Sequence, residues 1–386
     1  MPDGEHTAIV EVCASLADVP AADWDACAGP DNPFLSHAFL SSLEESGSVR
    51  AETGWLPQHL LVRDGTERLV AAMPLYLKGH SQGEYIFDYG WAHAYENAGG
   101  QYYPKLLSAV PFTPVPGPRL LTAGAPDPTA AAQYLVSAMA QLTERHGVSS
   151  LHVNFLEEPQ ARALEQAGFL VRHGHQFHWR NDGYACFDDF LAALASRKRK
   201  AVRKERRAVI DAGLTTKALT GDAITPDLWD AFYDFYTDTY DRKWGGPYLT
   251  RDFFDLLHAR MRDRVALMLA FDERGRPIAG ALNLIGGDAL YGRNWGCVAD
   301  YKFLHFELCY YMAIDFAIAR GLARVEAGTQ GEHKIQRGYM PVTTYSAHLI
   351  PDPAFRDAIA RFLEGERDHE ASLREALAEM APYRRN

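Results

Sequence analysis

Three short apolar segments, separated by turn residues, constrain the fold of this chain more than any other feature. The segments are Val265–Phe271, Pro277–Ile285 and Ala289–Trp295, with glycines and charged residues between them. Short apolar runs between glycine turns predict an antiparallel meander of strands. A long apolar helix is expected next, over Phe303–Arg320, because Gly321 provides a typical helix end.

The chain then continues with two further strands and a final helix. The strands are expected at Ala323–Ala327 and Val342–Ile350, and Pro351 and Pro353 introduce an amphipathic terminal helix. The first half shows the same order of elements without a repeat at the level of residues. Its strands are expected at Gln58–Val62, Leu69–Leu77, Tyr85–Tyr89, Ser150–Phe155 and Phe169–Trp179, and its helices at Thr129–His146 and Pro159–Gln166.

A meander, a helix and two closing strands, occurring twice, match the acetyltransferase-like (GNAT) fold. The predicted class is therefore α/β (α+β), with two tandem GNAT-like units, each a mixed, largely antiparallel sheet flanked by helices. We expect the first unit at residues 1–185 and the second at 186–386, which would open with a charged bridging helix over Phe187–Ala212. The proline-dense segment Pro111–Pro118 is expected to be a stiff loop over a groove.

Composition limits the environment and the classes of partner. The 386-residue chain has a formal net charge of −11, which argues against a broad non-specific nucleic-acid surface. Its five cysteines are odd in number and contain no CxxC pair, so neither a disulfide framework nor a zinc site is indicated. A reducing, cytoplasmic location is expected. The N-terminus lacks the pattern of a signal peptide, and no apolar run is long enough to predict a membrane span.

Five stretches resemble the FemAB-like predicted N-acyltransferases, which are often labelled peptidoglycan biosynthesis or recognition proteins. The resemblance runs from about Asn32 to about Glu370, and its most specific parts are the last two stretches. It implies a double GNAT-like fold and acyl transfer, by distant similarity to enzymes that add amino acids from aminoacyl-tRNA to cell-wall precursors. The stretches are Tyr102–Leu106, Pro111–Pro114, Leu290–Arg293, Leu304–Tyr311 and Gly328–Tyr339.

Acyl transfer to an amine needs a base, donors for the developing oxyanion and groups that hold the donor's phosphates. The glycine-flanked loop after the fifth strand of the second unit concentrates such groups. His333 or Glu332 is predicted to be the base, and Lys334 and Arg337 are predicted to contact phosphate or oxyanion. The resemblance implies a phosphate or transition-state role for Lys334, with Tyr339 following it. The alternative is a solvated, charged surface loop.

The apolar helix carries two carboxylates, Glu307 and Asp315, and a buried carboxylate is costly without a partner. Glu307 is taken as the candidate site residue. Arg293 on the preceding strand is the predicted partner, and a close arginine would lower the pKa of Glu307. The pair is interpreted as orienting the substrate or as a purely structural ion pair. Trp244, Trp91 and Tyr95 are predicted to wall the cleft, with ordinary packing as the alternative.

A dense basic run opens the second unit. Arg199, Arg203 and Arg206 share one helical face, which suits phosphates of tRNA, of a coenzyme or of a phospholipid carrier. The alternative is a solvated helix whose partners are neighbouring acids. His173, His175 and His178 lie along one predicted strand, but no supporting carboxylate or cysteine spacing accompanies them, so no metal is predicted.

The acyl donor is the least constrained part of the prediction. Typical acetyltransferases have a glycine-rich turn before the central helix that cradles the coenzyme pyrophosphate, whereas Trp295–Lys302 here has one glycine and an aspartate. Ordinary acetyl-CoA use is therefore in doubt, and aminoacyl-tRNA or an acyl carrier stays open. The prediction is an N-acyltransferase acting on an amine-bearing acceptor. The alternatives are an acyl-CoA-dependent N-acetyltransferase and a non-catalytic module that binds a cell-wall fragment or a lipid.

Overall fold

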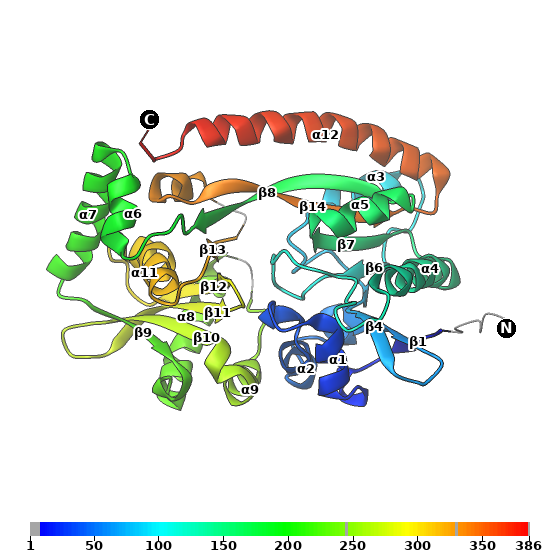
Figure 1. Cartoon of the computed structure of the whole chain (residues 1–386), viewed down its shortest axis with the longest axis horizontal. Helices are drawn as coiled ribbons and strands as arrows, with labels where there is room; N and C mark the ends of the chain where they lie inside the picture. The colour runs from blue at the N-terminus through cyan, green and yellow to red at the C-terminus, as the bar shows by residue number, and fades with distance from the viewer. Residues whose placement is uncertain (1–7, 244–245, 329–330, 385–386) are drawn as a thin grey trace. The chain divides into compact units, whose positions relative to one another are not determined.

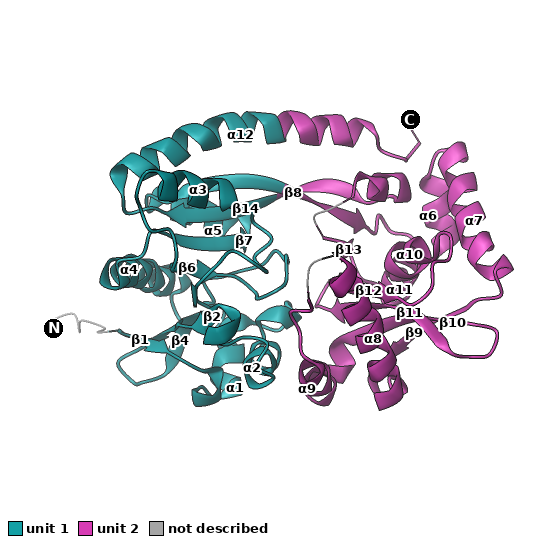
Figure 2. Cartoon of the chain, turned by 180° about the vertical axis from the view of Figure 1, so that it is seen from behind, with its two compact units in different colours: residues 1–174, 344–370 teal, residues 175–343, 371–386 magenta. Residues whose placement is uncertain are grey.

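The computed structural model describes residues 8–243, 246–328 and 331–384, and the chain forms two compact units (Figures 1 and 2). Each unit is built from two segments of chain. Unit 1 comprises Met1–Gly174 and Thr344–Glu370, and unit 2 comprises His175–Thr343 and Ala371–Asn386. The chain therefore passes from one unit to the other three times. The single division expected at residue 185 stays a prediction.

Unit 1 contains a small antiparallel sheet and a larger mixed one. The small sheet has the strand order β1-β3-β4, and the larger one is an 11-stranded mixed sheet, whose first five strands follow the order β2-β5-β6-β7-β14. Only β6 and β7 pair in parallel among the pairings described for these strands. The strands are β1 (Ile9–Cys13), β2 (Trp55–Pro57), β3 (His59–Arg63), β4 (Leu69–Met73), β5 (Tyr76–Lys78), β6 (Lys105–Ser108), β7 (Leu151–Leu156) and β14 (Met340–Leu349).

Helices flank these sheets because each has one apolar face. In α4, Leu135 and Met139 lie one turn apart and pack on β-strand residues such as Leu106 and Val153. Asp127 accepts the first N–H groups of α4, and Gly147 ends the helix in a left-handed conformation. The helices of this unit are α1 (Ala21–Ala28), α2 (His37–Glu45), α3 (Tyr89–Asn97), α4 (Pro128–His146), α5 (Glu158–Gln166) and the first part of α12 (Pro353–Glu379).

Unit 2 contains the predicted antiparallel meander. Val265 pairs with Leu284 in the β10–β11 ladder, and Ala279 with Cys297 in the β11–β12 ladder. Strand β12 then pairs in parallel with β13, which is antiparallel to β8. The strands follow the order β8-β13-β12-β11-β10-β9 and are β8 (Leu170–Arg180, shared with unit 1), β9 (Thr215–Thr220), β10 (Val265–Phe271), β11 (Pro277–Ile285), β12 (Ala289–Cys297) and β13 (Arg324–Glu326).

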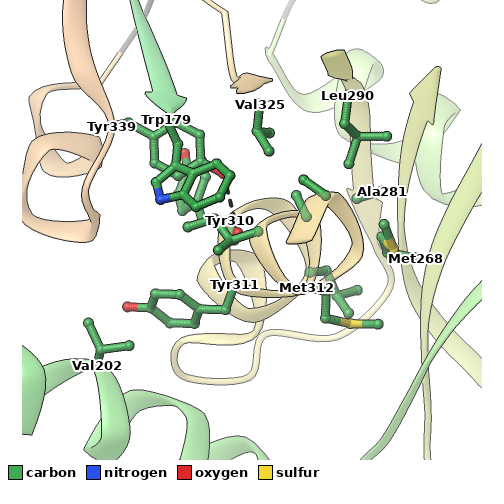
Figure 3. Close-up of a cluster of buried hydrophobic side chains, with 14 of the residues drawn as sticks. Trp179, Val202, Met268, Ala281, Leu290, Tyr310, Tyr311, Met312, Val325 and Tyr339 are labelled. Atoms are coloured by element: carbon green, nitrogen blue, oxygen red, sulfur yellow. Dashed lines mark hydrogen bonds between the residues drawn. The ribbon is translucent and has the colours of Figure 1, made fainter. Parts of the chain in front are cut away.

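An apolar central helix lies against this sheet. It is formed by α10, a π-helical turn and α11 in succession, and Tyr311 and Met312 from it share a core with Trp179, Met268 and Tyr339 (Figure 3). The helical segments of unit 2 are α6 (Phe187–Ala193), α7 (Ser196–Asp211), α8 (Pro226–Lys243), α9 (Arg251–Met261), α10 (Leu304–Phe306), the π turn (Glu307–Tyr311), α11 (Met312–Ala319), a 3-10 turn (Glu332–Arg337) and the end of α12. The predicted fold class, two tandem GNAT-like units of mixed sheet flanked by helices, is confirmed.

Three local predictions were wrong. Tyr85–Tyr89 is not a strand: Glu84 and Asp88 are buried and Tyr89 begins α3. The single strand expected at Leu69–Leu77 is two strands in different sheets, divided at Pro74, which cannot donate a ladder hydrogen bond. The single helix expected at Phe187–Ala212 is interrupted after Ala193, where Leu194 forms a β-bridge with Tyr383.

The proline-dense loop is also placed differently from the expectation. Most of residues 111–118 are buried, so the loop fills the interior of unit 1 rather than covering a groove. Its Gly117 N–H donates to the Phe155 carbonyl at the end of β7, at 3.0 Å. The fully buried Arg119 holds the loop by donating to the carbonyls of Val115, Gly117 and Pro118.

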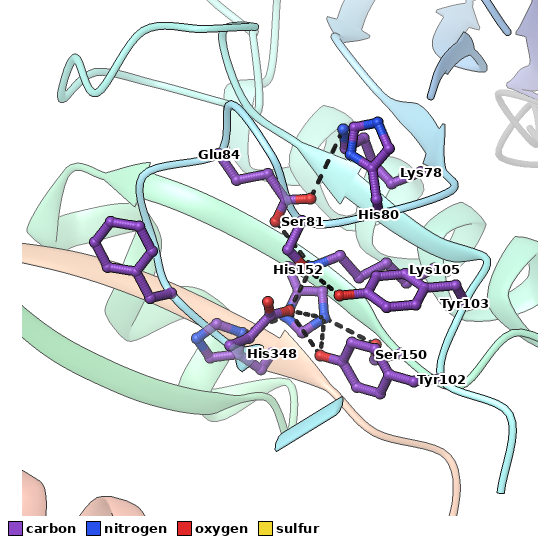
Figure 4. A network of polar contacts seen from close by, with 12 residues as sticks. Lys78, His80, Ser81, Glu84, Tyr102, Tyr103, Lys105, Ser150, His152 and His348 are labelled. Atoms are coloured by element: carbon purple, nitrogen blue, oxygen red, sulfur yellow. Dashed lines mark hydrogen bonds and ion pairs between the residues drawn. The ribbon is translucent and has the colours of Figure 1, made fainter. Parts of the chain in front are cut away.

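Unit 1 contains a network of buried charges (Figure 4), which includes Asp88 at the N-cap of α3. The Lys105 ammonium contacts the carboxylates of Asp88 and, at 2.8 Å, Glu84. Tyr102 donates to Asp88 at 2.7 Å and contacts His152. Burial would raise the pKa of Asp88, but Lys105 and His152 hold it well below its usual range. Charges that are removed from water need such close compensation.

Candidate active site

The candidate site of unit 2 lies where two parallel strands separate. Strand β12 pairs with β13 only from Ala289 to Tyr291, which is opposite Glu326. Beyond these positions the two segments line a cavity of about 490 Å³. Strand β12 contributes Gly292–Trp295 to its lining, and Ala327, the residue after β13, lines it as well. Separated strand ends expose backbone and side chains that a continuous ladder would cover. The glycine-flanked loop that the sequence places after the fifth strand of this unit also contributes to the cavity, through His333 and Lys334.

A β-bulge in β12 places two polar side chains at this cavity. Ala281 pairs with Trp295 and Asn283 with Gly292, so two residues of β12, Arg293 and Asn294, lie opposite the single Leu282. An extra residue re-aims the side chains on the bulged strand and increases its twist. Arg293 and Asn294 both line the cavity as a result.

The π-helical turn forms another wall. The turn continues from the short helix α10, whose N-cap residue is Phe303. Phe303 has a positive φ of 70°, an uncommon conformation for an aromatic residue. The wider turn at Glu307–Tyr311 changes the phase of the helix, and Cys309 and Tyr310 line the cavity with His305 from the preceding turn. Such turns occur often at functional sites. Burial raises the pKa of Cys309 well above its usual value, so its thiol stays protonated.

Lys334 is the buried cation of the cavity. Only 4% of the residue is exposed, and its ammonium donates to the carbonyls of Ala327 at 2.6 Å and Gly328 at 3.2 Å. Burial, with a smaller contribution from the nearby Arg293, lowers the pKa of Lys334 to about 8. Two neutral carbonyls position the charge without neutralising it. An incoming anion or a developing oxyanion would supply the missing negative charge.

His333 stands beside Lys334 at the cavity. Its Nε2 lies 3.1 Å from the Tyr310 hydroxyl. Partial burial lowers the pKa of His333, and the charges of Arg337 and Lys334 act in the same direction. The imidazole is therefore neutral near pH 7. In the tautomer that carries its proton on Nε2, this proton is donated to the Tyr310 oxygen and Nδ1 can accept another.

Three other loop residues have different surroundings. Glu332 is exposed and is absent from the lining of the cavity in the part of the chain that the structure describes. Arg337 is buried, binds both carboxylate oxygens of Glu205 at 2.9 Å and covers the ring of Phe306. Tyr339 is fully buried and donates to the Tyr310 carbonyl at 3.2 Å. Arg337 and Tyr339 thus support the walls of the site.

The predicted ion pair of Glu307 has a different partner. Its carboxylate binds Arg206 from α7 at 2.9 Å, whereas Arg293 was expected, and Arg206 also binds Asp315 at 2.8 Å. The expectation for its pKa was wrong as well. Burial raises the pKa of Glu307, and the opposing effect of Arg206 is smaller.

Two arginines of the basic run on α7 already form ion pairs within unit 2. Arg206 contacts Glu307, and Arg203 pairs with Asp188 at 3.1 Å. Arg199 is half-buried on the same helix. Phosphate binding by these arginines stays a prediction, and Arg206 would have to leave two carboxylates to take part.

Two of the three predicted aromatic walls, Trp91 and Tyr95, do not line this cavity. Trp91 and Tyr95 lie on α3 of unit 1, where they line a different hollow. Trp244 lies outside the described residues. The aromatic side chain that does line the cavity from β12 is Trp295, whose ring packs edge-on against His305 with centroids 5.1 Å apart.

The stretch that matches the coenzyme turn has a packing role. A Cβ on Gly296 would lie 2.1 Å from the carbonyl oxygen of Phe235, so this glycine lets β12 approach α8 closely. Its conformation does not have a positive φ of the kind found in phosphate-cradling turns. Among the residues that the structure describes, no group of three or more His, Cys, Asp or Glu side chains forms a metal-binding cluster.

Sequence reasoning found part of the cavity and missed the rest. Lys334, His333 and Arg293 were predicted and line it together. Tyr310, Cys309 and Asn294 were missed as site residues. A signal for two of them was present, because Cys309 and Tyr310 lie within the stretch that carries the family resemblance. No sequence pattern used in the prediction indicates the β-bulge that places Asn294 at the cavity.

Comparisons with known proteins place the chain in a family. A family model for FemAB-like proteins, described as peptidoglycan biosynthesis/recognition, matches residues 15–385. No curated protein sequence matches. Within residues 8–243, 246–328 and 331–384, no helix is long and apolar enough to cross a membrane.

Several solved structures share the fold at low sequence identity. FemX aligns with a TM-score of 0.56 and 12% identity, covering 89% of this chain and 98% of FemX. The C-terminal domain of a putative lysylphosphatidylglycerol synthetase from Agrobacterium fabrum aligns with a TM-score of 0.56 and 10% identity, over 91% and 97% of the two chains. L-PGS from Bacillus licheniformis aligns with a TM-score of 0.52 and 9% identity, covering 86% of this chain and 98% of L-PGS. With the family match over nearly its whole length, the chain belongs to the FemAB-like family of peptidoglycan biosynthesis/recognition proteins.

Proposed function

We propose that this protein is an N-acyltransferase that transfers an aminoacyl or acyl group to an amine in the cavity of unit 2. The observation that carries the proposal is Lys334, a buried cation held at the separated strand ends by two carbonyls. Membership of the family supports a peptidoglycan-related acceptor. A cytoplasmic location is part of the same proposal.

The reaction follows from the groups that line the cavity. The acceptor amine attacks the acyl carbonyl, a C–N bond forms, the bond from the carbonyl carbon to the donor's oxygen or sulfur breaks, and that atom departs with the proton that the amine has lost. His333 takes the proton that the amine loses, at Nδ1, and the Tyr310 hydroxyl holds the imidazole through Nε2. The Lys334 ammonium stabilises the negative charge on the carbonyl oxygen. Arg293 binds an anionic group of donor or acceptor.

The donor in this proposal is aminoacyl-tRNA or another activated acyl carrier rather than acetyl-CoA. The support is Gly296, which packs against α8 where an acetyltransferase would have a pyrophosphate turn. Calorimetry with acetyl-CoA should therefore give no isotherm in the micromolar range. A clear micromolar isotherm would favour the acyl-CoA-dependent alternative.

Radiolabelled transfer tests the activity itself. The protein would be incubated with total tRNA charged with labelled amino acids and with peptidoglycan stem peptides as amine acceptors. We expect label in the peptide, and Lys334→Met should reduce the rate about 10²–10³-fold. Lys204→Met, which removes an exposed charge from α7, is the matched control and should keep full activity.

The stability of Lys334→Met separates catalysis from folding. Its melting temperature should be equal to or above that of the wild type, because a desolvated charge is removed. Absence of transfer with every donor and acceptor, while stem peptide still binds, would identify a non-catalytic binding module instead.

A further inference from the structure

Two apolar helix faces in unit 1 stand opposite each other around a hollow. Helix α3 presents Ala94, its C-cap residue Ala98 follows one turn later, and α12 presents Phe355, Ala358 and Phe362. The hollow between them measures about 730 Å³, which is within the usual range for small-molecule sites. Figure 1 shows α3 beneath the first half of α12.

The apolar walls are preformed by packing. The Tyr95 ring lies against Phe355 with centroids 4.4 Å apart. A Cβ on Gly100 would lie 2.4 Å from the Tyr95 ring, so only glycine at position 100 permits this orientation. Trp91 packs edge-on against the buried His348, with centroids 4.8 Å apart. These contacts fix three of the rings that an apolar ligand would touch.

One end of the hollow is polar and acidic. A second hollow of about 630 Å³ shares Tyr95 and Asp352 with the first and adds Gln101 and Glu144. It also includes Gly147 at the C-terminal end of α4, where the helix dipole is negative. Among the described residues that line the two hollows, two are carboxylates and none is lysine, arginine or histidine.

We propose that unit 1 carries a second ligand site, which binds an amphipathic primary amine. The apolar body lies between α3 and α12 against Trp91 and Phe355, and the ammonium group lies past Tyr95 in the second hollow, which Glu144 and Asp352 both line. Aromatic rings and carboxylates together favour an ammonium group over a neutral or anionic head group. This site is separate from the proposed acyl transfer and does not depend on it.

Three probes of equal chain length test the head-group preference. Octylamine, octanol and octanoate would be titrated by calorimetry at low ionic strength and neutral pH. We expect octylamine to bind most tightly and octanoate most weakly. Equal or tighter binding of octanoate, or no binding of octylamine, would overturn the proposal.

Two substitutions locate the binding. Ala358→Phe fills the apolar part from an exposed helix position and should weaken octylamine and octanol binding at least about tenfold. Glu144→Gln should weaken octylamine about two- to fivefold and leave octanol unchanged. The controls are Ala376→Phe on the exposed face of α12 and Glu67→Gln in an exposed turn. If the controls weaken binding as much as Ala358→Phe and Glu144→Gln do, the amine binds elsewhere and the proposal is wrong.

Discussion

At the scale of single residues, the low pKa of Lys334 predicts how activity and stability depend on pH. Burial lowers this pKa from 10.5 to about 8. If the protonated ammonium stabilises the transition state, the rate falls as pH rises through about 8. Between pH 8 and 10.5 the unfolded chain binds more protons at this position than the folded chain, so the Lys334 contribution to the free energy of unfolding rises with pH.

Urea titrations across pH 7–10.5, on wild type and Lys334→Met, check the sign. The free energy of unfolding of the wild type should rise relative to that of the variant above pH 8, because only the wild type has a desolvated Lys334 ammonium that loses its charge. A difference that stays constant would mean that Lys334 titrates at its ordinary value.

The buried network of unit 1 predicts a large effect from a single substitution. Lys105→Met leaves Asp88 and Glu84 buried without their common cation and should destabilise the protein by about 3–5 kcal/mol. Neutralising the acids as well, in Lys105→Met/Asp88→Asn/Glu84→Gln, should recover part of this loss. Chemical denaturation measures both, and a triple variant no more stable than the single one would contradict the charge argument.

Two of the three cavity residues that sequence reasoning identified lie in a short, unusually charged loop. Lys334 and His333 stand out because glycines flank a cluster of four ionisable side chains. The partner of Glu307 could not be found in this way. Several arginines were available, and the choice of Arg206 over Arg293 depends on how α7 packs against the π turn.

At the scale of elements, Gly296 gives a test of what the stretch before the central helix does. Gly296→Ala would place its Cβ 2.1 Å from the Phe235 carbonyl oxygen, and backbone atoms of α8 cannot move aside easily. We expect a loss of about 3 kcal/mol in the free energy of unfolding. Gly365→Ala in α12, where a Cβ meets nothing within 4 Å, should be neutral or slightly stabilising. A Gly296→Ala protein of normal stability would rule out the packing role.

Strands and helices with strong local patterns were predicted well. The meander at β10–β12 has three apolar runs between glycine turns, and α4 has both of its caps in the sequence. The segment at Tyr85–Tyr89 reverses the usual pattern, because Phe87 is 57% exposed while Asp88 is 3% exposed. The short apolar run over residues 85–87 therefore predicted the wrong element. The break at Leu194 arises from its bridge to Tyr383, which is far away in sequence.

At the scale of the whole chain, each unit consists of two segments, and residues of the other unit separate these segments in the sequence. Strand β14 pairs with β7 through residues such as Tyr345 and Leu156, and Phe355 and Ile359 of α12 complete a core with Trp91. A boundary drawn along the sequence assigns β14 and this part of α12 to the second half. Periodicity identifies both elements but does not show which sheet or core they join.

Because unit 1 is built from two separate segments of the chain, it is possible to predict which fragments can fold. A fragment of residues 1–185 lacks Thr344–Glu370, so the β7 edge loses its partner and Trp91 loses the α12 side of its core; it should aggregate or remain partly unfolded. A fusion of residues 1–174 to 344–370 through a few glycine and serine residues should unfold cooperatively, because a Cβ on Gly174 would lie only 3.2 Å from the Thr344 hydroxyl and a short linker can join these ends. Circular dichroism during thermal unfolding compares the two. A well-folded 1–185 fragment, with the same transition as the fusion, would show that the segment beyond residue 343 is dispensable for unit 1.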